Sequence, residues 1–260
     1  MKYMVSSRQD KETRAHADEI FLAARDIREL KDVTEKNPDK PIIVEFDSRL
    51  LNDYDMYDIG HNLDRYILSV ASFDEKFLYY HNLYNFRFFY KYPVNNYYDF
   101  NSLKEYGVEY IKVTGDLLFD IDFLSKAKGD IKLRATPNVA YYNNVPRSES
   151  QGMFGNWIRP EDVELYESAI DVLEFEDANI QKEKTLLDIY QQQKKWNGNL
   201  NLLFTNFYIN IDNKIVDDFN LGEKRINCRR KCMSGGLCRA CKNVLLFNKT
   251  ILLSNQKSSN

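Results

Sequence analysis

The sequence has few of the residues that mark non-globular chains. It holds only ten glycines and six prolines in 260 residues, against 43% hydrophobic and 14% aromatic residues. This excludes a disordered, collagenous or linker-dominated chain and indicates one large or two ordinary globular domains. No run approaches the roughly 18 uninterrupted apolar residues of a membrane span, and the start MKYMV lacks the apolar centre of a secretion signal. We expect a soluble, cytoplasmic protein with no membrane partner, and composition leaves its oligomeric state open.

Acidic residues are missing from the end of the chain. All 39 lie at or before Glu223, with 27 of the 36 basic residues, so residues 1–223 carry a net charge of −12 and residues 224–260 carry +9. A basic segment of this kind is typical of one that binds a polyanion. Alternatively, it docks on the acidic body of the same chain.

Short apolar or β-branched runs alternate with helix-like segments along the first two thirds of the chain. Eight such runs predict strands, at Lys2–Ser6, Glu19–Ala24, Pro41–Phe46, Tyr66–Ala71, Phe86–Lys91, Tyr110–Gly115, Ile131–Thr136 and Val172–Asp177. Helix start signals lie between them, including Pro160 followed by acidic residues in a first turn. Eight strand–helix units can close into a parallel barrel with no free edge.

An open, doubly wound sheet is the rival architecture. The sequence lacks G-x-G-x-x-G and G-x-x-x-x-G-K-[ST], the phosphate-binding turns common in such sheets, which favours the barrel. We therefore predict a (β/α)8 TIM-like barrel over residues 1–223, a basic four-cysteine module over 224–250 and a frayed tail over 251–260.

All four cysteines fall within fourteen residues near the end of the chain, at Cys228, Cys232, Cys238 and Cys241. With glycines between them, four thiolates can surround one tetrahedral metal ion or one cluster. A disulfide pair is the alternative, which a cytoplasmic location disfavours. Spacing alone slightly favours zinc, while iron–sulfur clusters accept variable spacing.

Basic residues surround these cysteines, and Arg225, Arg229, Arg230, Lys231 and Arg239 are the candidate nucleic-acid contacts. Some of this charge offsets the −2 of a zinc ion bound by four thiolates. The remainder suggests a phosphate-binding face, with RNA as the expected partner.

In a barrel, chemistry is concentrated where strands end. The charged residues there give Glu45, Lys112, Arg134 and Glu176 as candidate catalytic residues, with Arg25 and Asn138 as candidate substrate contacts. Because Glu45 and Lys112 alternate with apolar neighbours, each can point into the barrel. A structural ion pair of Arg134 with Glu174 or Glu176 is an equally good interpretation.

The long segment Tyr141–Arg159 follows the seventh predicted strand and is a candidate lid or substrate loop, or else a stabilising cover. Within it, Trp157 and Arg159 are candidate substrate contacts, although a loop tryptophan is more often a packing anchor. The sequence has no G-x-S-x-G or H-E-x-x-H motif, which argues against a hydrolytic serine or a zinc protease.

Two stretches resemble the peptidase U32 family, the collagenase-like group. One runs from Gly107 to Asp120 and is followed by Ile131–Val139, and the other runs from Trp157 to Tyr166 and continues through Ile170–Glu176. The resemblance implies a barrel, an iron–sulfur cluster held by four cysteines, and hydroxylation of RNA bases or ubiquinone precursors. The family's usual cysteine signature after the glutamate-rich strand is absent here.

Three functions follow as hypotheses. The leading one is a metal- or cluster-containing barrel enzyme that modifies RNA or a related polyanion. The second is a non-catalytic binding or assembly protein with a structural zinc site. The third is a peptidase.

Overall fold

The structure of the chain is a computed structural model that describes residues 1–6, 8, 11–129, 131–139, 155–175, 180–204, 210–226, 228 and 241–249, without the side chains of 12, 13 and 180–184. Within these ranges, eight parallel strands form a closed barrel in the order β1 to β8, which confirms the predicted barrel. The strands are β1 Lys2–Ser6, β2 Glu19–Leu22, β3 Ile42–Phe46, β4 Tyr66–Val70, β5 Phe88–Tyr90, β6 Tyr110–Lys112, β7 Lys132–Ala135 and β8 Val172–Glu174. Strand β8 pairs with β1 and closes the ring.

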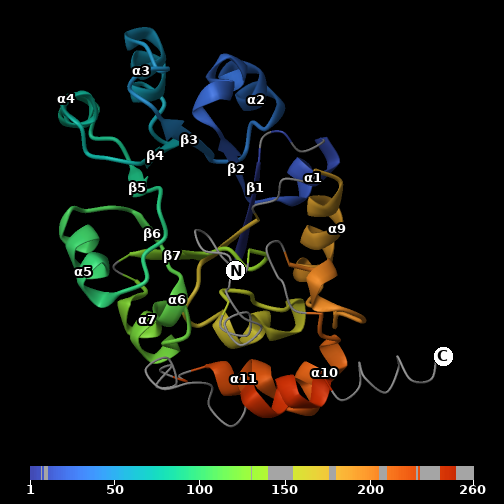
Figure 1. The fold of residues 1–260 in the computed structure, drawn as a ribbon. Helices are drawn as coiled ribbons and strands as arrows, with labels where there is room; N and C mark the ends of the chain where they lie inside the picture. The colour runs from blue at the N-terminus through green and yellow to red at the C-terminus, as the bar shows by residue number, and fades with distance from the viewer. Residues whose placement is uncertain are drawn as a thin grey trace.

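Helices surround the barrel (Figure 1). They are α1 Lys11–His16, η1 Ala24–Glu29, α2 Leu30–Lys36, α3 Asp53–Gly60, α4 Glu75–Tyr84, α5 Tyr97–Glu105, α6 Gly115–Leu118, α7 Ile121–Ala127, η2 Pro160–Tyr166, α9 Ile180–Gln191, η3 Leu200–Leu202, α10 Asn213–Asp218 and α11 Leu221–Arg225. Residues 241–249 are also helical. No helix in these ranges is both long and apolar enough to cross a lipid bilayer.

Polar side chains fix where several of these helices begin. The side chains of Asn52, Asp74, Asn96 and Asp120 accept hydrogen bonds from backbone amides in the first turns of α3, α4, α5 and α7. Each such cap contributes about 1 kcal/mol. The segment after Pro160 begins as predicted, but it forms the 3-10 helix η2 rather than an α-helix.

The strands bury both of their faces. Outward residues such as Val44 and Leu68 pack against the helices in the larger apolar core. Inward residues Met4, Ile43, Ile67, Phe89, Tyr110 and Val172 form a second, smaller core inside the barrel. Because alternate residues of a strand share a face, the residue two positions after each of these points inward again, nearer the carboxyl end of its strand.

The predicted boundary at residue 223 falls inside α11, which continues to Arg225. Beyond it, Cys241, Val244 and Leu245 are buried in the same core as the barrel helices. The predicted tail, 251–260, lies outside the described residues.

Candidate active site at the carboxyl ends of the strands

A polar layer lies on the carboxyl side of the inner apolar core. Counting two residues on from Ile43, Ile67, Tyr110 and Val172 gives Glu45, Ser69, Lys112 and Glu174, all on the inward face of their strands. Arg134 joins them from β7, because its guanidinium lies 4.0 Å from the centre of the inward Phe89 ring. The site therefore occupies the end of the barrel where barrel enzymes carry their chemistry.

Three charged side chains meet at one oxygen atom in this layer. Glu174 Oε2 lies 2.6 Å from Arg134 Nη2 and 2.8 Å from Lys112 Nζ. Lys112, Arg134 and Glu174 are 4%, 1% and 8% exposed, so the cluster is buried. Burial alone would raise the pKa of Glu174, but Arg134 and Lys112 outweigh it and lower the pKa, which keeps the carboxylate ionised.

Only some of the hydrogen-bond donors of Arg134 have a partner. Its Nη2 donates to Glu174 and lies 3.3 Å from Met4 Sδ. Its Nε and Nη1 are buried and have no hydrogen-bond partner in the part of the chain that the structure describes. Unpaired buried donors cost on the order of 1–3 kcal/mol, and more on a charged group, so an acceptor is expected here.

Three hydroxyl groups on the inward face or just after the strands are also unpartnered. Ser69 Oγ, Thr114 Oγ1 and Thr136 Oγ1 are buried and make no hydrogen bond within the described ranges. Thr114 follows Lys112 by two residues and Thr136 follows Arg134 by two, so both continue the inward faces of β6 and β7. Unpartnered hydroxyls directly after β6 and β7, close in sequence to Lys112 and Arg134, indicate a place for a polar ligand or water.

Glu45 is also paired. It forms an ion pair with Lys91 and accepts a hydrogen bond from the Ala24 backbone amide at 3.2 Å. Glu176, the other glutamate proposed from the sequence, lies outside the described residues. The described carboxylate of the cluster is Glu174, which sequence reasoning considered only as a structural partner of Arg134.

The candidate substrate contacts lie in different settings. The Arg25 side chain is mostly exposed and lies 3.9 Å from Asp26. Asn138 is buried in the turn after β7. Trp157 is fully buried, and its ring lies 5.5 Å from that of Phe204. This setting agrees with the alternative that Trp157 is a packing anchor.

Arg159 holds the polypeptide together around η2 and α10. Its Nε lies 2.6 Å from Asp162 Oδ2, its Nη1 donates to Asn213 Oδ1 at 2.9 Å, and it pairs with Asp217. Although burial opposes it, these acidic partners raise the pKa of Arg159. The buried guanidinium thus joins η2, which precedes β8, to α10, which follows the last strand, while its role toward substrate stays a prediction.

Arg225 is buried rather than displayed on a basic face. Its Nη1 donates to the Trp157 carbonyl at 2.9 Å, and its guanidinium lies 3.6 Å from the centre of the Trp157 ring. It also lies 4.4 Å from the centre of the Phe119 ring, just after α6. The other candidate nucleic-acid contacts, Arg229, Arg230, Lys231 and Arg239, lie outside the described residues.

The structure describes two of the four proposed metal ligands. Cys228 is half-buried, and its amide donates to the Arg225 carbonyl at 3.2 Å; Cys241 is buried. Cys232 and Cys238 lie outside the described residues. Two thiols cannot complete a four-ligand site, and the described ranges contain no group of three possible ligands. A zinc ion or iron–sulfur cluster therefore remains a prediction from spacing.

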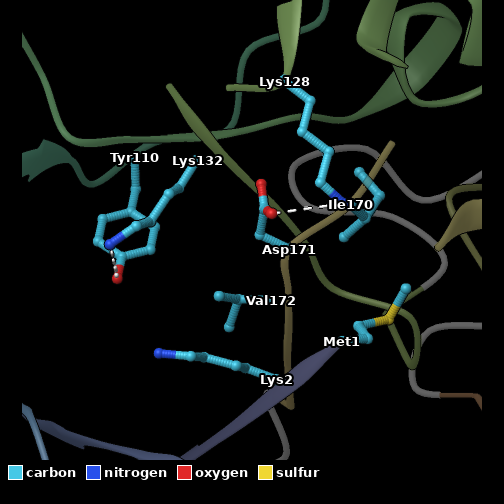
Figure 2. Close-up of a pocket in the computed structure, with 8 residues that line it drawn as sticks. All are labelled: Met1, Lys2, Tyr110, Lys128, Lys132, Ile170, Asp171 and Val172. Carbon is cyan, nitrogen blue, oxygen red and sulfur yellow. Dashed lines mark hydrogen bonds and ion pairs between the residues drawn. The ribbon is translucent and has the colours of Figure 1, made fainter. Parts of the chain in front are cut away.

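A cavity of about 240 Å³ opens at the opposite, amino end of the barrel. In Figure 2, Lys128 pairs with Asp171 and the Lys132 ammonium lies beside the Tyr110 hydroxyl, while Lys2 reaches in from β1. Lys132 is also 2.8 Å from Glu109, and Lys2 is 3.7 Å from Glu19. Because each lysine already has an acidic partner, we assign the charges at this end a structural role in the barrel and not a ligand-binding role.

Comparisons with known proteins add little to this geometry. No protein-family description matches the chain, and no curated protein matches it. Among solved structures, the chain is similar to a cube-shaped, highly porous protein cage designed by fusing symmetric oligomeric domains, with a TM-score of 0.42 and 9% sequence identity over 99% of this chain and 85% of that chain. This similarity is too low to transfer a function.

Proposed function

We propose that the protein is a barrel enzyme whose substrate places a carboxylate or phosphate group against Arg134 at the carboxyl ends of β6, β7 and β8. The observation that carries this proposal is the buried guanidinium with two unpartnered nitrogens. Arginine presents paired N–H groups that fit the two oxygens of such an anion.

Each member of the cluster has a role in this proposal. Glu174, held ionised by its neighbours, fixes the orientation of Arg134. Lys112, whose ammonium is buried at 2.8 Å from Glu174, adds a second positive charge beside Arg134 for the anion. Ser69, Thr114 and Thr136 offer hydroxyls that can bind further polar atoms of the substrate.

The predicted RNA-modifying activity and U32 resemblance are narrower versions of this proposal. The RNA prediction rests on the basic four-cysteine segment, and the resemblance rests on the stretches from Gly107 to Val139 and from Trp157 to Glu176 together with the cysteines. If they hold, Cys228, Cys232, Cys238 and Cys241 bind the zinc ion or iron–sulfur cluster. A cluster would supply electron transfer, and a zinc ion would supply structural support.

A binding experiment tests the proposal. Isothermal titration with phosphate, acetate and pyruvate should show saturable binding of at least one anion to the wild-type chain. Arg134→Met should weaken that binding about tenfold or more, since a charge-assisted hydrogen bond contributes about 1.5–3 kcal/mol. The matched control is Arg87→Met, because Arg87 is a paired arginine at the amino end, 2.6 Å from Glu109.

The results separate the hypotheses. Equal binding by wild type and Arg134→Met, or no binding of any of these anions, contradicts the proposal. The rival hypothesis, a non-catalytic protein with a structural zinc site, expects Glu45→Ala and Arg134→Ala to leave function in cells unchanged while Cys238→Ser unfolds the end of the chain.

A further inference from the structure

The chain between α9 and η3 is attached to α10 on both sides of a bend. The side-chain amide of Asn213 donates to the Trp196 carbonyl at 2.7 Å, and the Asn213 backbone amide donates to the Gly198 carbonyl at 2.9 Å. Asn213 is fully buried at the start of α10, and its side-chain oxygen accepts a hydrogen bond from Arg159 at 2.9 Å. One residue therefore joins the bend to the buried Arg159 network.

Asn197 lies between these two attachment points. Its side chain is exposed and makes no hydrogen bond with any residue that the structure describes. Within the same ranges, the Gly198 amide nitrogen has no acceptor either. Gly198 has a φ of +118°, and a Cβ at this position would meet nothing within 4 Å. The bend thus leaves the Asn197 side chain and the next backbone nitrogen unbound and in open space.

Asn197 and Gly198 form the only Asn-Gly pair in the sequence. The nitrogen of the following residue can attack the side-chain carbon Cγ of an asparagine, which closes a succinimide ring and releases ammonia. A side chain on the following residue crowds this attack, and a helix restrains the nitrogen by hydrogen bonding it to a carbonyl. Glycine has no Cβ and a wide choice of φ. The pair at 197–198 is free of both obstacles.

We propose that Asn197 is a site of spontaneous deamidation and that the isoaspartate formed there weakens the attachment of α10. The reaction needs only water, and the inference does not depend on the anion site at Arg134. It assigns a covalent modification to a segment that the proposed function does not use.

The reaction balances with one water consumed and one ammonia released. The Gly198 nitrogen loses its proton to solvent and bonds to Asn197 Cγ, and the side-chain nitrogen leaves as ammonia. Water then opens the ring at one of its two carbonyl carbons. Opening at Cγ gives aspartate with a normal main chain. Opening at the main-chain carbon gives isoaspartate, in which the main chain runs through Cβ and Cγ.

The isoaspartate product changes the distance that Asn213 has to span. It adds a carbon–carbon bond of about 1.5 Å to the main chain between the Trp196 and Gly198 carbonyls. Because hydrogen bonds keep their length only within a few tenths of an ångström, the two bonds from Asn213 are not both kept. A buried donor of Asn213 then lacks its partner, which destabilises the start of α10.

A time course on the wild-type chain tests the site. The full-length protein is kept in mildly alkaline buffer for several days, and peptide mass spectrometry locates each deamidated asparagine. Asn197 should deamidate at least about tenfold faster than Asn101, a ratio equal to about 1.4 kcal/mol in the barrier. Asn101 is the matched comparison, because it is exposed and precedes the small residue Ser102 but lies inside α5. The rate at Asn197 should rise with pH, since the attacking nitrogen must lose a proton.

Three variants isolate the chemistry. Asn197→Gln should abolish the modification, because the longer side chain would have to close a larger ring. Gly198→Ala should slow it by crowding the attack, although the positive φ strains this variant. Asn197→Asp carries the same added charge as isoaspartate but keeps the normal main chain. The comparison with Asn101 uses the wild-type chain, so it holds even if a variant fails to fold.

Hydrogen exchange tests the structural consequence. Ion exchange separates the deamidated chains, which carry one more negative charge, and peptide fragmentation measures their isoaspartate content. Amides of α10 in the isoaspartate protein should exchange about two- to tenfold faster than in unmodified protein, the change expected from losing one hydrogen bond. Asn197→Asp should exchange like the unmodified protein.

Each outcome supports or overturns a defined part of the inference. Deamidation of Asn197 no faster than that of Asn101 overturns the site. Isoaspartate at residue 197 with unchanged exchange in α10 overturns the weakened attachment. The same acceleration in Asn197→Asp assigns the effect to charge and overturns the argument from the longer main chain. None of these results bears on anion binding at Arg134.

Discussion

Lys112 and Arg134 lie opposite each other on neighbouring strands and approach the same oxygen atom, Oε2 of Glu174. Parallel pairing of β6 with β7 fixes them as register partners, and β8 brings the carboxylate. The cluster is therefore a property of the barrel's register rather than of a loop. A shift of one residue in any of these strands would turn its side chain toward the helices.

Replacing Glu174 by glutamine should strongly destabilise the protein. The change removes the carboxylate between two buried cations, and breaking a buried ion pair from one side costs about 3–5 kcal/mol. Urea unfolding of the variant and the wild type measures this cost. Asp32→Asn, which removes an exposed partner of Lys36 on α2, is the control and should cost about 1 kcal/mol or less. Similar costs for the two variants would contradict a buried cluster.

Arg134→Met should cost less stability than Glu174→Gln, about 1–2 kcal/mol. The ion pair between Lys112 and Glu174 remains in the variant, and methionine still packs on Phe89. It should nevertheless weaken the anion binding described above about tenfold or more. Unfolding and titration on the same preparation check both parts. A variant that unfolds readily but still binds the anion normally would assign Arg134 a purely structural role.

The free energy of unfolding should depend on pH through the charge cluster of Arg87, Glu109 and Lys132 at the amino end of the barrel. Burial opposes the ionisation of Glu109, but Arg87 and Lys132 outweigh it and lower its pKa below the usual 4.5. The folded state therefore binds this proton less readily than the unfolded chain. The stabilisation is fully present above about pH 5 and is lost as the pH falls through 4.5 and below.

Urea unfolding midpoints at pH 7, 4.5 and 3.5 test this assignment. Glu109→Gln should be less stable than the wild type at pH 7, and the difference should shrink at pH 3.5. A difference that stays constant over this range would show that the charge of Glu109 contributes nothing.

The Arg159 network should contribute strongly to local stability. Arg159→Met leaves Asp162 and Asp217 without this buried partner, at a cost of about 3–5 kcal/mol. The exposed Arg49, paired with Asp47, offers the matched control Arg49→Met, expected to cost about 0–1 kcal/mol. Relative to the wild type, the Arg159 variant should show its largest increase in amide hydrogen exchange in α10 and η2. Unchanged exchange there would argue against this network.

The four-cysteine segment predicts one inorganic centre per chain. Protein purified without oxygen should contain either zinc or iron with sulfide, and Cys228→Ser and Cys238→Ser should both lower that content. Metal analysis with an absorption spectrum distinguishes the two ions. Metal-free wild-type protein with four titratable thiols would refute the centre.

The sequence could predict the barrel because strand and helix periodicities differ. The first predicted strand, Lys2–Ser6, has the observed bounds, and the others differ from the observed strands at their ends. For β5 and β6 the reason is the pairing: they share one register pair, Phe89 with Tyr110, so both are shorter than their apolar runs.

The site was predictable only in part, because contacts across the barrel depend on register. Alternation along single strands pointed to Lys112 and Glu45, the position at a strand end pointed to Arg134, and the Arg134–Glu174 pair was one of two interpretations considered. Ser69, Lys91, Thr114 and Thr136 were not singled out. The signal for Ser69 was present, since it is the one polar residue within a buried strand, Tyr66–Val70. Its significance depends on neighbours from other strands.

The pairing of β1 with β8 has a consequence during synthesis on the ribosome. The first strand to emerge must wait for Val172–Glu174 before its second edge is covered, so the ring cannot close until about two thirds of the chain has been made. A truncated product ending before β8 would expose backbone edges on β1 and β7. Such a fragment should associate with other nascent or incomplete chains, whereas the finished barrel offers no edge for this.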